Sequence, residues 1–365
     1  MSEEGCFILQ PGVDIRPKIT ISESQILLEL LYGVKCKTIV ELNAYDDKNY
    51  KVTLDENCEN VFIPKINEHG YVLKIMNKLD SQKLAFVDAQ NKMMLYLGNN
   101  NIKCPKPVLN KRGEYYSLEK LEGSGDHVVR LLEFLPGKIF YEVPPTPDLL
   151  YDVGRYVANL NKVLKNFYHT AYKSHKSLWM FEAVPDIKKF LYVVKNKEDK
   201  QMIEAIIDEF EIRVLRNMGI LEKGMLHGDF NEQNIVVRET EDGSWKIDSI
   251  LDFGDSQYSC LLFELAIAIT YMILQCKEIY MAGHVLAGYS FIQPVPEHEY
   301  KLLKVCVAAR LCQSLVLGAY SSLQDPNNKY ILTTQTTGWT MLRKLWKEPE
   351  EILYEEWKKV EDEYK

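Results

Sequence analysis

The segment HGDFNEQNIVV, residues 227–237, places a histidine, two acids and two asparagines directly before an apolar run. Asn234 follows Asp229 after five residues, and Asp252-Phe253-Gly254 begins 23 residues after Asp229. Phosphoryl transfer needs one carboxylate at the acceptor hydroxyl, together with an amide oxygen and a second carboxylate that hold magnesium on the nucleotide phosphates. The residue types and their spacing therefore indicate a phosphoryl-transfer site.

A cation for the phosphates is expected from the segment GYVLKIM, where Lys74 lies among apolar residues of a predicted strand. An inward-facing lysine is costly unless it is paired. Asp88, in the next predicted helix, is a candidate partner that would aim Lys74 at the phosphates. The alternative is that both side chains are exposed at the surface. We favour the paired arrangement because the downstream motif requires a cation.

Two groups of elements are expected to position these residues. Residues 1–20 are interpreted as a loose arm, and residues 21–135 as a compact lobe rich in strands. Within this lobe the patterns predict helices from Ser22 or Ser24 to Gly33 and over 80–98, and strands near 37–42, 49–54, 71–76, 107–110, 114–118 and 127–135. Pro136-Gly137 ends the strand pattern.

From residue 136 to 365 the chain is predicted to be mostly helical, beginning with helices near 147–167, 185–194 and 198–218. Residues 234–253 form two apolar segments around Asp242-Gly243, which predicts a hairpin. This hairpin would bring the ends that carry Asn234 and Asp252 side by side. The expected fold class is α+β, and the gap between two such lobes is a common ligand site.

Composition narrows the class of protein. The 365 residues carry a net charge of −8 and show no basic stripe, which argues against nucleic acid as the main partner. The apolar run 260–274 is too short to span a membrane and contains Glu264, so a buried helix and no membrane partner are predicted. Eight cysteines without a CxxC pair indicate reduced thiols and a cytoplasmic location.

HGDFNEQN, the LDFGD segment 251–255 and the upstream lysine together resemble the aminoglycoside phosphotransferase and choline kinase family. The resemblance covers residues from about 21 to 345, and it implies a bilobal protein-kinase-like fold. Within the family, AYDDKNY, VVRLLEFLPGK and ILDFGDSQYS are similar to a branch of animal enzymes. That branch implies Mg²⁺-dependent transfer of the γ-phosphoryl of GTP to the hydroxyl of 5-hydroxy-L-lysine, a cationic amino acid, in lysine breakdown.

The resemblance also implies a role for each matching residue. Asp229 matches the catalytic base, Asn234 and Asp252 match the magnesium ligands, and Lys74 matches the phosphate lysine. Residues 132–135, which include Glu133, Phe134 and Leu135, match the hinge whose backbone faces the purine.

Two departures from the family pattern stand out. The helix position that kinases fill with glutamate is Asp88, which is one methylene shorter. The loop LNAYDDKNYKV contains no glycine, so a glycine-rich flap over the phosphates is absent. Asn49 is the candidate that would offer a side-chain amide there.

Three further residues have open interpretations. His227 is either catalytic or, as we favour, structural, bonding backbone near the catalytic loop. Asp255 is assigned either to an ammonium group of the substrate or to the N-cap of a helix that begins near Ser259. Glu264 lies in an apolar helix, so it either pairs with a nearby cation, which we favour, or lines the acceptor pocket.

Three functions fit these observations. The first is the hydroxylysine-directed kinase, and the second keeps the reaction but takes choline, ethanolamine or another amino alcohol as acceptor. The third is an inactive nucleotide-binding scaffold, which the short Asp88 and the glycine-free loop would suit. The residues alone leave the purine, the acceptor and the oligomeric state open.

Overall fold

The computed structural model describes residues 9–10, 12–326 and 334–365. The chain separates into two compact units, with unit 1 ending at Pro136 and unit 2 running from Gly137 to Lys365. The division falls next to the strand-to-helix change expected near residue 135.

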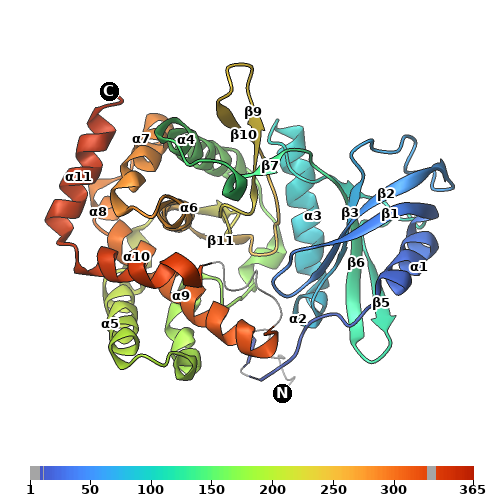
Figure 1. The fold of residues 1–365 in the computed structure, drawn as a ribbon, viewed down its shortest axis with the longest axis horizontal. Coiled ribbons are helices and arrows are strands. Elements are labelled where there is room, and N and C mark those ends of the chain that lie inside the picture. The colour runs from blue at the N-terminus through green and yellow to red at the C-terminus, as the bar shows by residue number, and fades with distance from the viewer. Residues whose placement is uncertain (1–8, 11, 327–333) are drawn as a thin grey trace. The chain divides into compact units, whose positions relative to one another are not determined.

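Unit 1 is built on one antiparallel sheet of six strands (Figure 1). The strands lie in the order β1-β2-β3-β6-β4, and β5 also pairs with β6. Their bounds are β1 Val34–Leu42, β2 Lys48–Cys58, β3 Tyr71–Ile75, β4 Pro107–Val108, β5 Ser117–Leu121 and β6 Gly125–Glu133. Helices α1 (Ile21–Tyr32), α2 (Lys78–Ser81) and α3 (Leu84–Asn99) complete the unit.

Side chains along each strand point alternately to the two faces of this sheet, and each face packs against a different helix. Leu73, Ile75 and Leu131 pack in one apolar cluster with Leu28 and Tyr32 of α1. The intervening residues of β3 and β6 point to the other face, where Met76 and Val128 contact Val87 of α3. Lys74 of β3 and Arg130 of β6 lie opposite each other in the strand register. Both side chains belong to this second face, and both are buried.

The start of unit 1 differs from the sequence prediction. Helix α1 is capped by Thr20, whose side chain and Glu23 form a capping box, and neither serine is the cap. Residues 1–8 and 11 of the expected arm lie outside the described residues. Ile15 is buried, and its carbonyl accepts a hydrogen bond from Lys78 N. The end of the arm is therefore attached to helix α2 rather than loose.

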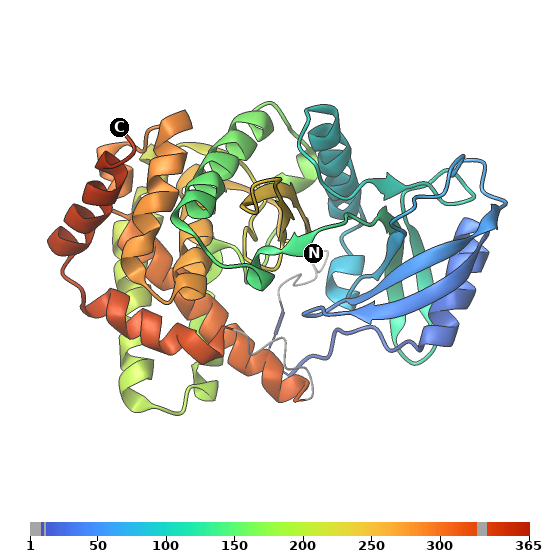
Figure 2. The same ribbon diagram turned by 45° about the horizontal axis from the view of Figure 1, so that its top comes forward.

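Unit 2 is mostly helical (Figure 2). The α-helices are α4 Pro147–Leu164, α5 Lys197–Arg213, α6 Leu261–Cys276, α7 Ala282–Ile292, α8 Glu297–Tyr300, α9 Leu303–Gln324, α10 Gln335–Lys347 and α11 Glu350–Asp362. Short 3-10 helices cover Phe140–Glu142, Thr170–Lys173, Phe181–Val193, Leu215–Ile220 and Ile279–Met281. The helix expected over 185–194 is instead a 3-10 helix over Phe181–Val193, which contains Pro185.

The interior of unit 2 is formed by α6 and α9. The apolar run expected as a buried helix is α6, in which every residue from Leu261 to Leu274 is buried. Helix α9 is the one described helix that is long and apolar enough to cross a membrane, and 94% of its apolar window is buried inside the protein. Both helices are therefore core helices by their packing.

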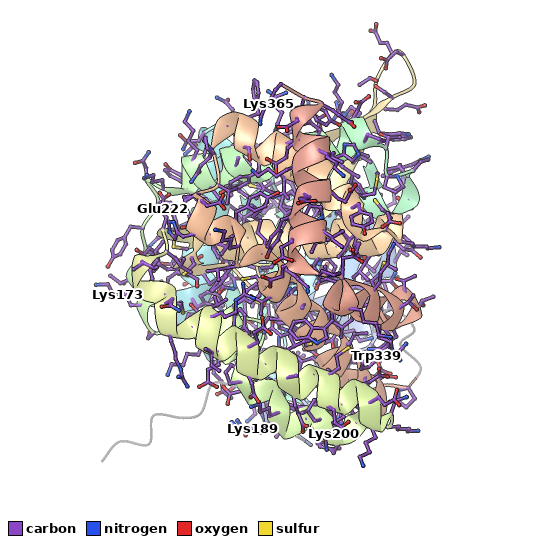
Figure 3. The ribbon with its side chains drawn as sticks, turned by 90° about the vertical axis from the view of Figure 1, so that its left-hand side faces the viewer. Lys173, Lys189, Lys200, Glu222, Trp339 and Lys365 are labelled. Carbon is purple, nitrogen blue, oxygen red and sulfur yellow. The ribbon has the colours of Figure 1, made fainter. Side chains whose placement is uncertain are left out.

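The surface of unit 2 carries polar helices around this core (Figure 3). Lys200 marks the start of α5 in that view, and the neighbouring Asp199 accepts two hydrogen bonds from Arg343 of α10, at 2.8 and 2.6 Å. Trp339 and Lys365, also labelled there, belong to α10 and to the end of the chain.

Helices α4 and α7 approach closely where each has a glycine. A Cβ atom on Gly154 would lie 1.9 Å from the carbonyl oxygen of Val285, and one on Gly288 would lie 1.9 Å from that of Tyr151. Both obstacles are backbone atoms, so a side chain would force the helices apart.

We expect Gly154→Ala to lower the free energy of unfolding of unit 2 by about 3 kcal/mol, at the upper end of overpacking costs. All five tryptophans lie in unit 2, so denaturant unfolding followed by tryptophan fluorescence reports on this unit. Gly219→Ala is the matched control because a Cβ there meets no atom within 4 Å. Equal unfolding midpoints for the two variants would contradict the close approach of α4 and α7.

Candidate active site

Two small antiparallel pairings in unit 2 hold two loops next to each other. Strand β8 (Lys223–Leu226) pairs with β11 (Gln257–Cys260), and β9 (Ile235–Glu239) pairs with β10 (Trp245–Ile250). The loop 227–234 connects β8 to β9, and the loop 251–256 connects β10 to β11. Each loop therefore leaves one pairing and enters the other, and both are anchored at both ends. Strand β7 (Lys138–Ile139) adds a third strand beside β9.

Asn234 and Asp252 emerge together at the open end of the predicted hairpin. Ile235 is paired with Ile250, and the carbonyl of Asn234 accepts a 2.7 Å hydrogen bond from Leu251 N. Asn234 directly precedes Ile235, and Asp252 follows Ile250 after the intervening Leu251. The hairpin predicted around Asp242-Gly243 thus sets the separation of the two side chains.

Asp229 joins this group through the side chain of Asn234. Asn234 Nδ2 donates to Asp229 Oδ2 at 2.8 Å and to the Asp229 carbonyl at 3.0 Å. Asn231 stabilises the loop between them, because its Oδ1 accepts hydrogen bonds from the backbone N–H groups of Gln233 and Asn234. The amide nitrogen of Asn234 faces Asp229, which leaves its oxygen to face away from that carboxylate.

His227 fastens the two loops to each other, as expected for a structural histidine. Its Nε2 bonds the Leu251 carbonyl at 2.8 Å, and Asp229 N donates to Nδ1 at 3.3 Å. Burial lowers the pKa of His227, so the ring is neutral at pH 7. Phe253 packs edge-on against the ring at 4.9 Å.

Gly228 is required at its position for two reasons. Its φ is +83°, and a Cβ would lie 2.1 Å from the carbonyl oxygen of Asp255. Asp252 also has a positive φ, +51°, and its Oδ1 accepts a hydrogen bond from Gly254 N at 2.9 Å. The turn that presents Asp252 is therefore a specific, strained conformation.

The structure gives Glu264 a backbone partner. This side chain is fully buried in α6, and its carboxylate accepts hydrogen bonds from Gly228 N at 3.3 and 3.1 Å. Burial raises its pKa to about 7, although Arg310 is a nearby cation that acts in the opposite direction. Glu264 therefore supports the backbone of the loop that carries Asp229, and its place at the acceptor pocket stays a prediction.

The structure also excludes one of the two interpretations of Asp255. Helix α6 begins at Leu261 with Cys260 at the N-cap, and β11 lies between Asp255 and the helix. Asp255 is therefore not the cap. Its assignment to a substrate ammonium group stays a prediction.

Sequence reasoning missed Arg310, which contacts Asp229 from α9. Its Nη2 donates to Asp229 Oδ1 at 3.0 Å, and its side chain is only 1% exposed. The two oxygens of Asp229 thus have separate donors, Arg310 and Asn234. The available signal was a single arginine within the long apolar run VCVAARLCQSLVLGAY.

In unit 1, the ion-pair partner found for Lys74 is Asp47, a residue that sequence reasoning also missed. Lys74 Nζ lies 2.8 Å from Asp47 Oδ2, and the other oxygen of Asp47 accepts from Asn77 N at 2.7 Å. Asp88 ion-pairs with Lys92 at 2.7 Å, one turn further along α3. The role predicted for Asp88 at Lys74 stays a prediction.

Asp47 belongs to the glycine-free loop between β1 and β2. Asn49, at the start of β2, is paired in register with Lys74, so their side chains share one face. The Oδ1 atom of Asn49 is buried without a hydrogen-bond partner. Burial raises the pKa of the neighbouring Asp46 to about 7, although Arg16 lies 3.7 Å away.

The predicted hinge follows β6 at the end of unit 1. Glu133 N donates to the Lys106 carbonyl at 2.9 Å, and Phe134 N donates to the Gly70 carbonyl at 3.0 Å. Lys51 Nζ lies 3.7 Å from the centre of the Phe134 ring. These two N–H groups are engaged within unit 1, so a purine would have to be recognised by other groups of the segment, such as those of Leu135.

The donor set in unit 2 suits a magnesium ion that is shared with phosphates. Within the described residues no group of three or more His, Cys, Asp or Glu side chains is arranged to hold a metal by itself. Mg²⁺ commonly takes one or two protein oxygens and completes its shell with phosphate oxygens and water. The Asn234 amide oxygen and the Asp252 carboxylate fit that pattern.

With this geometry, comparison with known proteins defines the class. The model of the phosphotransferase enzyme family matches residues 43–294, and the chain belongs to that family. The protein is accordingly a phosphotransferase with an alcohol group as acceptor.

The chain is similar to particular kinases both in sequence and in structure. A hydroxylysine kinase of Xenopus laevis is 34% identical over 368 residues, which is 96% of each chain. The structure of a microcompartment-associated aminopropanol kinase superposes with a TM-score of 0.69 at 16% identity, covering 89% of this chain and 97% of that one. The structure of an amicoumacin kinase bound to AMP-PNP and Ca²⁺ superposes with a TM-score of 0.64 at 18% identity. The superposition covers 92% of this chain and 94% of that one. The protein-kinase-like fold predicted from sequence is confirmed.

Proposed function

We propose that this protein transfers the γ-phosphoryl group of GTP to the hydroxyl of 5-hydroxy-L-lysine with Mg²⁺ as cofactor. The observation that carries the proposal is the grouping of Asp229, Asn234 and Asp252 on two adjoining loops. The acceptor is suggested by the hydroxylysine kinase at 34% identity. GTP as donor rests on the family resemblance of the sequence.

Asp229 is the proposed base. In the loose transition state of phosphoryl transfer, the acceptor proton needs a nearby carboxylate more for orientation than for early removal. Each carboxylate oxygen can accept more than one hydrogen bond, so Asp229 can take the substrate O–H in addition to its bonds from Asn234 and Arg310. Its side chain is 22% exposed, which leaves room for such a contact.

Asn234 and Asp252 would hold Mg²⁺, which when bound neutralises phosphate oxygens as charge develops on them. Lys74 is proposed to bind phosphate oxygens as well, with Asp47 holding its ammonium group in place. Asp255 is proposed to attract an ammonium group of the acceptor. We assign the enzyme to the cytoplasm, a choice that the seven free cysteines among the described residues support.

The proposal is tested with a panel of acceptors offered to the purified protein with either GTP or ATP. We expect Mg²⁺-dependent formation of a phosphorylated product from 5-hydroxy-L-lysine and GTP, detected by mass spectrometry. Choline, ethanolamine and lysine, which lacks the hydroxyl, serve as comparison acceptors. Lysine should give no product, because it has no hydroxyl to accept the phosphoryl group. With choline and ethanolamine we expect a kcat/KM at least about 100-fold lower, because their missing hydrogen-bonding groups leave polar groups of the site unpaired.

The other outcomes of the panel are equally informative. A preference for choline or ethanolamine would replace the acceptor and keep the reaction. A preference for ATP would replace the donor. Nucleotide binding without transfer to any acceptor would identify an inactive scaffold and overturn the proposal.

A further inference from the structure

Asp229 contacts α9 through the side chain of Arg310. Helix α9 is an apolar core helix, and Arg310 is completely buried in it. Its guanidinium extends to the loop 227–234, although the two positions are 81 residues apart in the chain. A charge is placed there at a considerable desolvation cost, which the partner carboxylate must offset.

Several groups fix the guanidinium of Arg310 in one orientation. Nη1 donates to the Trp179 carbonyl at 3.0 Å, while Nη2 is directed at Asp229. The plane also faces the rings of Trp179, at 5.1 Å, and Tyr271, at 5.6 Å. Gln313, one turn further along α9, holds the same segment through the carbonyls of Leu178 and Met180. The donor therefore reaches Asp229 from a rigid support.

The consequence for Asp229 is a fixed carboxylate plane. Arg310 holds Oδ1 and Asn234 holds Oδ2, each at 3.0 Å or less. A carboxylate with one donor can rotate about its last bond, whereas two donors on different oxygens prevent that rotation. Reacting groups held in this way gain from orientation, and a misplacement of about 1 Å costs roughly 100-fold in rate.

We propose that Arg310 is a positioning residue that orients the Asp229 carboxylate for phosphoryl transfer. This inference rests on the proposed function, because it assumes that Asp229 is the base. Arg310 acts through Asp229 and requires no contact with the acceptor or the nucleotide.

The test compares Arg310→Met with Arg343→Met by steady-state kinetics and thermal unfolding. Arg343 is the control, since it donates two hydrogen bonds to a different acid, the nearly buried Asp199, although its side chain is 43% exposed and that of Arg310 only 1%. We expect both variants to lose stability, whereas only Arg310→Met loses kcat, by about 100-fold. Its KM for the nucleotide should stay within about threefold of the wild-type value, because the metal ligands are unchanged.

A second measurement separates orientation from packing. In Arg310→Ala, added guanidinium ion should restore kcat by at least about tenfold and in a saturable manner, and it should not raise kcat in Arg343→Ala. If Arg310→Met does not fold, Arg310→Lys decides, since lysine keeps the charge and loses the planar fork. We expect Arg310→Lys to retain a folded core with kcat lowered about tenfold.

Wild-type kcat in Arg310→Lys or Arg310→Met would overturn the inference, as would a guanidinium effect of equal size in both alanine variants. The inference and the proposed function fail in different ways. If the wild-type protein transfers phosphate to no acceptor, the proposed function fails. If the wild-type protein is active and the Arg310 variants match it, only the positioning role fails.

Discussion

Asp229→Asn is expected to lower kcat by about 10²–10⁴-fold, the range found when a positioned acid or base is removed. Asparagine preserves the shape of the side chain and removes the negative charge that receives the acceptor proton. It also leaves Arg310 without its anionic partner in a buried place, so some loss of stability is expected. The affinity for GTP, measured by calorimetry with a non-hydrolysable analogue, should change by less than about threefold.

The control for this variant is Asp208→Asn. Asp208 is 61% exposed on α5 and pairs with Lys188, so the loss of its charge costs little. Its kcat should equal the wild-type value. Near-normal turnover of Asp229→Asn under the same conditions would remove Asp229 from the role of base.

Asp252→Asn is expected to abolish the magnesium-dependent part of nucleotide binding and to lower kcat by roughly 10²–10³-fold. Asparagine tolerates the positive φ at this position, so the turn should keep its conformation while the metal loses a charged ligand. The measurement is the affinity for a GTP analogue, titrated with Mg²⁺ and again with a chelator. In the variant the two affinities should be equal.

Asp248→Asn is the matched control, because Asp248 lies four residues earlier on β10 and its ion-pair partner is Arg238. This variant should retain the full magnesium effect. If Asp252→Asn keeps the same magnesium effect as Asp248→Asn, then Asp252 does not bind the metal.

The parts of the site that sequence could predict are those that the local chain determines. Asn234 and Asp252 are brought together by one hairpin, whose turn at Asp242-Gly243 is visible in the sequence. Asp229 lies five residues from Asn234, within reach of a single loop. In unit 1, the alternation of apolar residues places Lys74 on a sheet, although it does not say which acid reaches the ammonium group.

The residues that sequence reasoning missed are joined by tertiary packing. Arg310 and Asp229 meet because α9 passes beside the loop 227–234, and no local pattern encodes that approach. Asp47 reaches Lys74 from the loop between β1 and β2, and no local pattern encodes that contact either. Glu264 was recognisable as a buried acid, but its partner is a backbone N–H, a group that every residue except proline offers.

In the proposed mechanism Asn234 and Asp252 bind a divalent ion, while Asp229 accepts the proton of the acceptor hydroxyl. Electron paramagnetic resonance of Mn²⁺, titrated into the protein with a GTP analogue, tests this division directly. We expect the wild-type protein and Asp229→Asn to bind Mn²⁺ with the nucleotide, and Asp252→Asn to lose this binding. Unchanged Mn²⁺ binding in Asp252→Asn, or its loss in a folded Asp229→Asn, would disprove these roles.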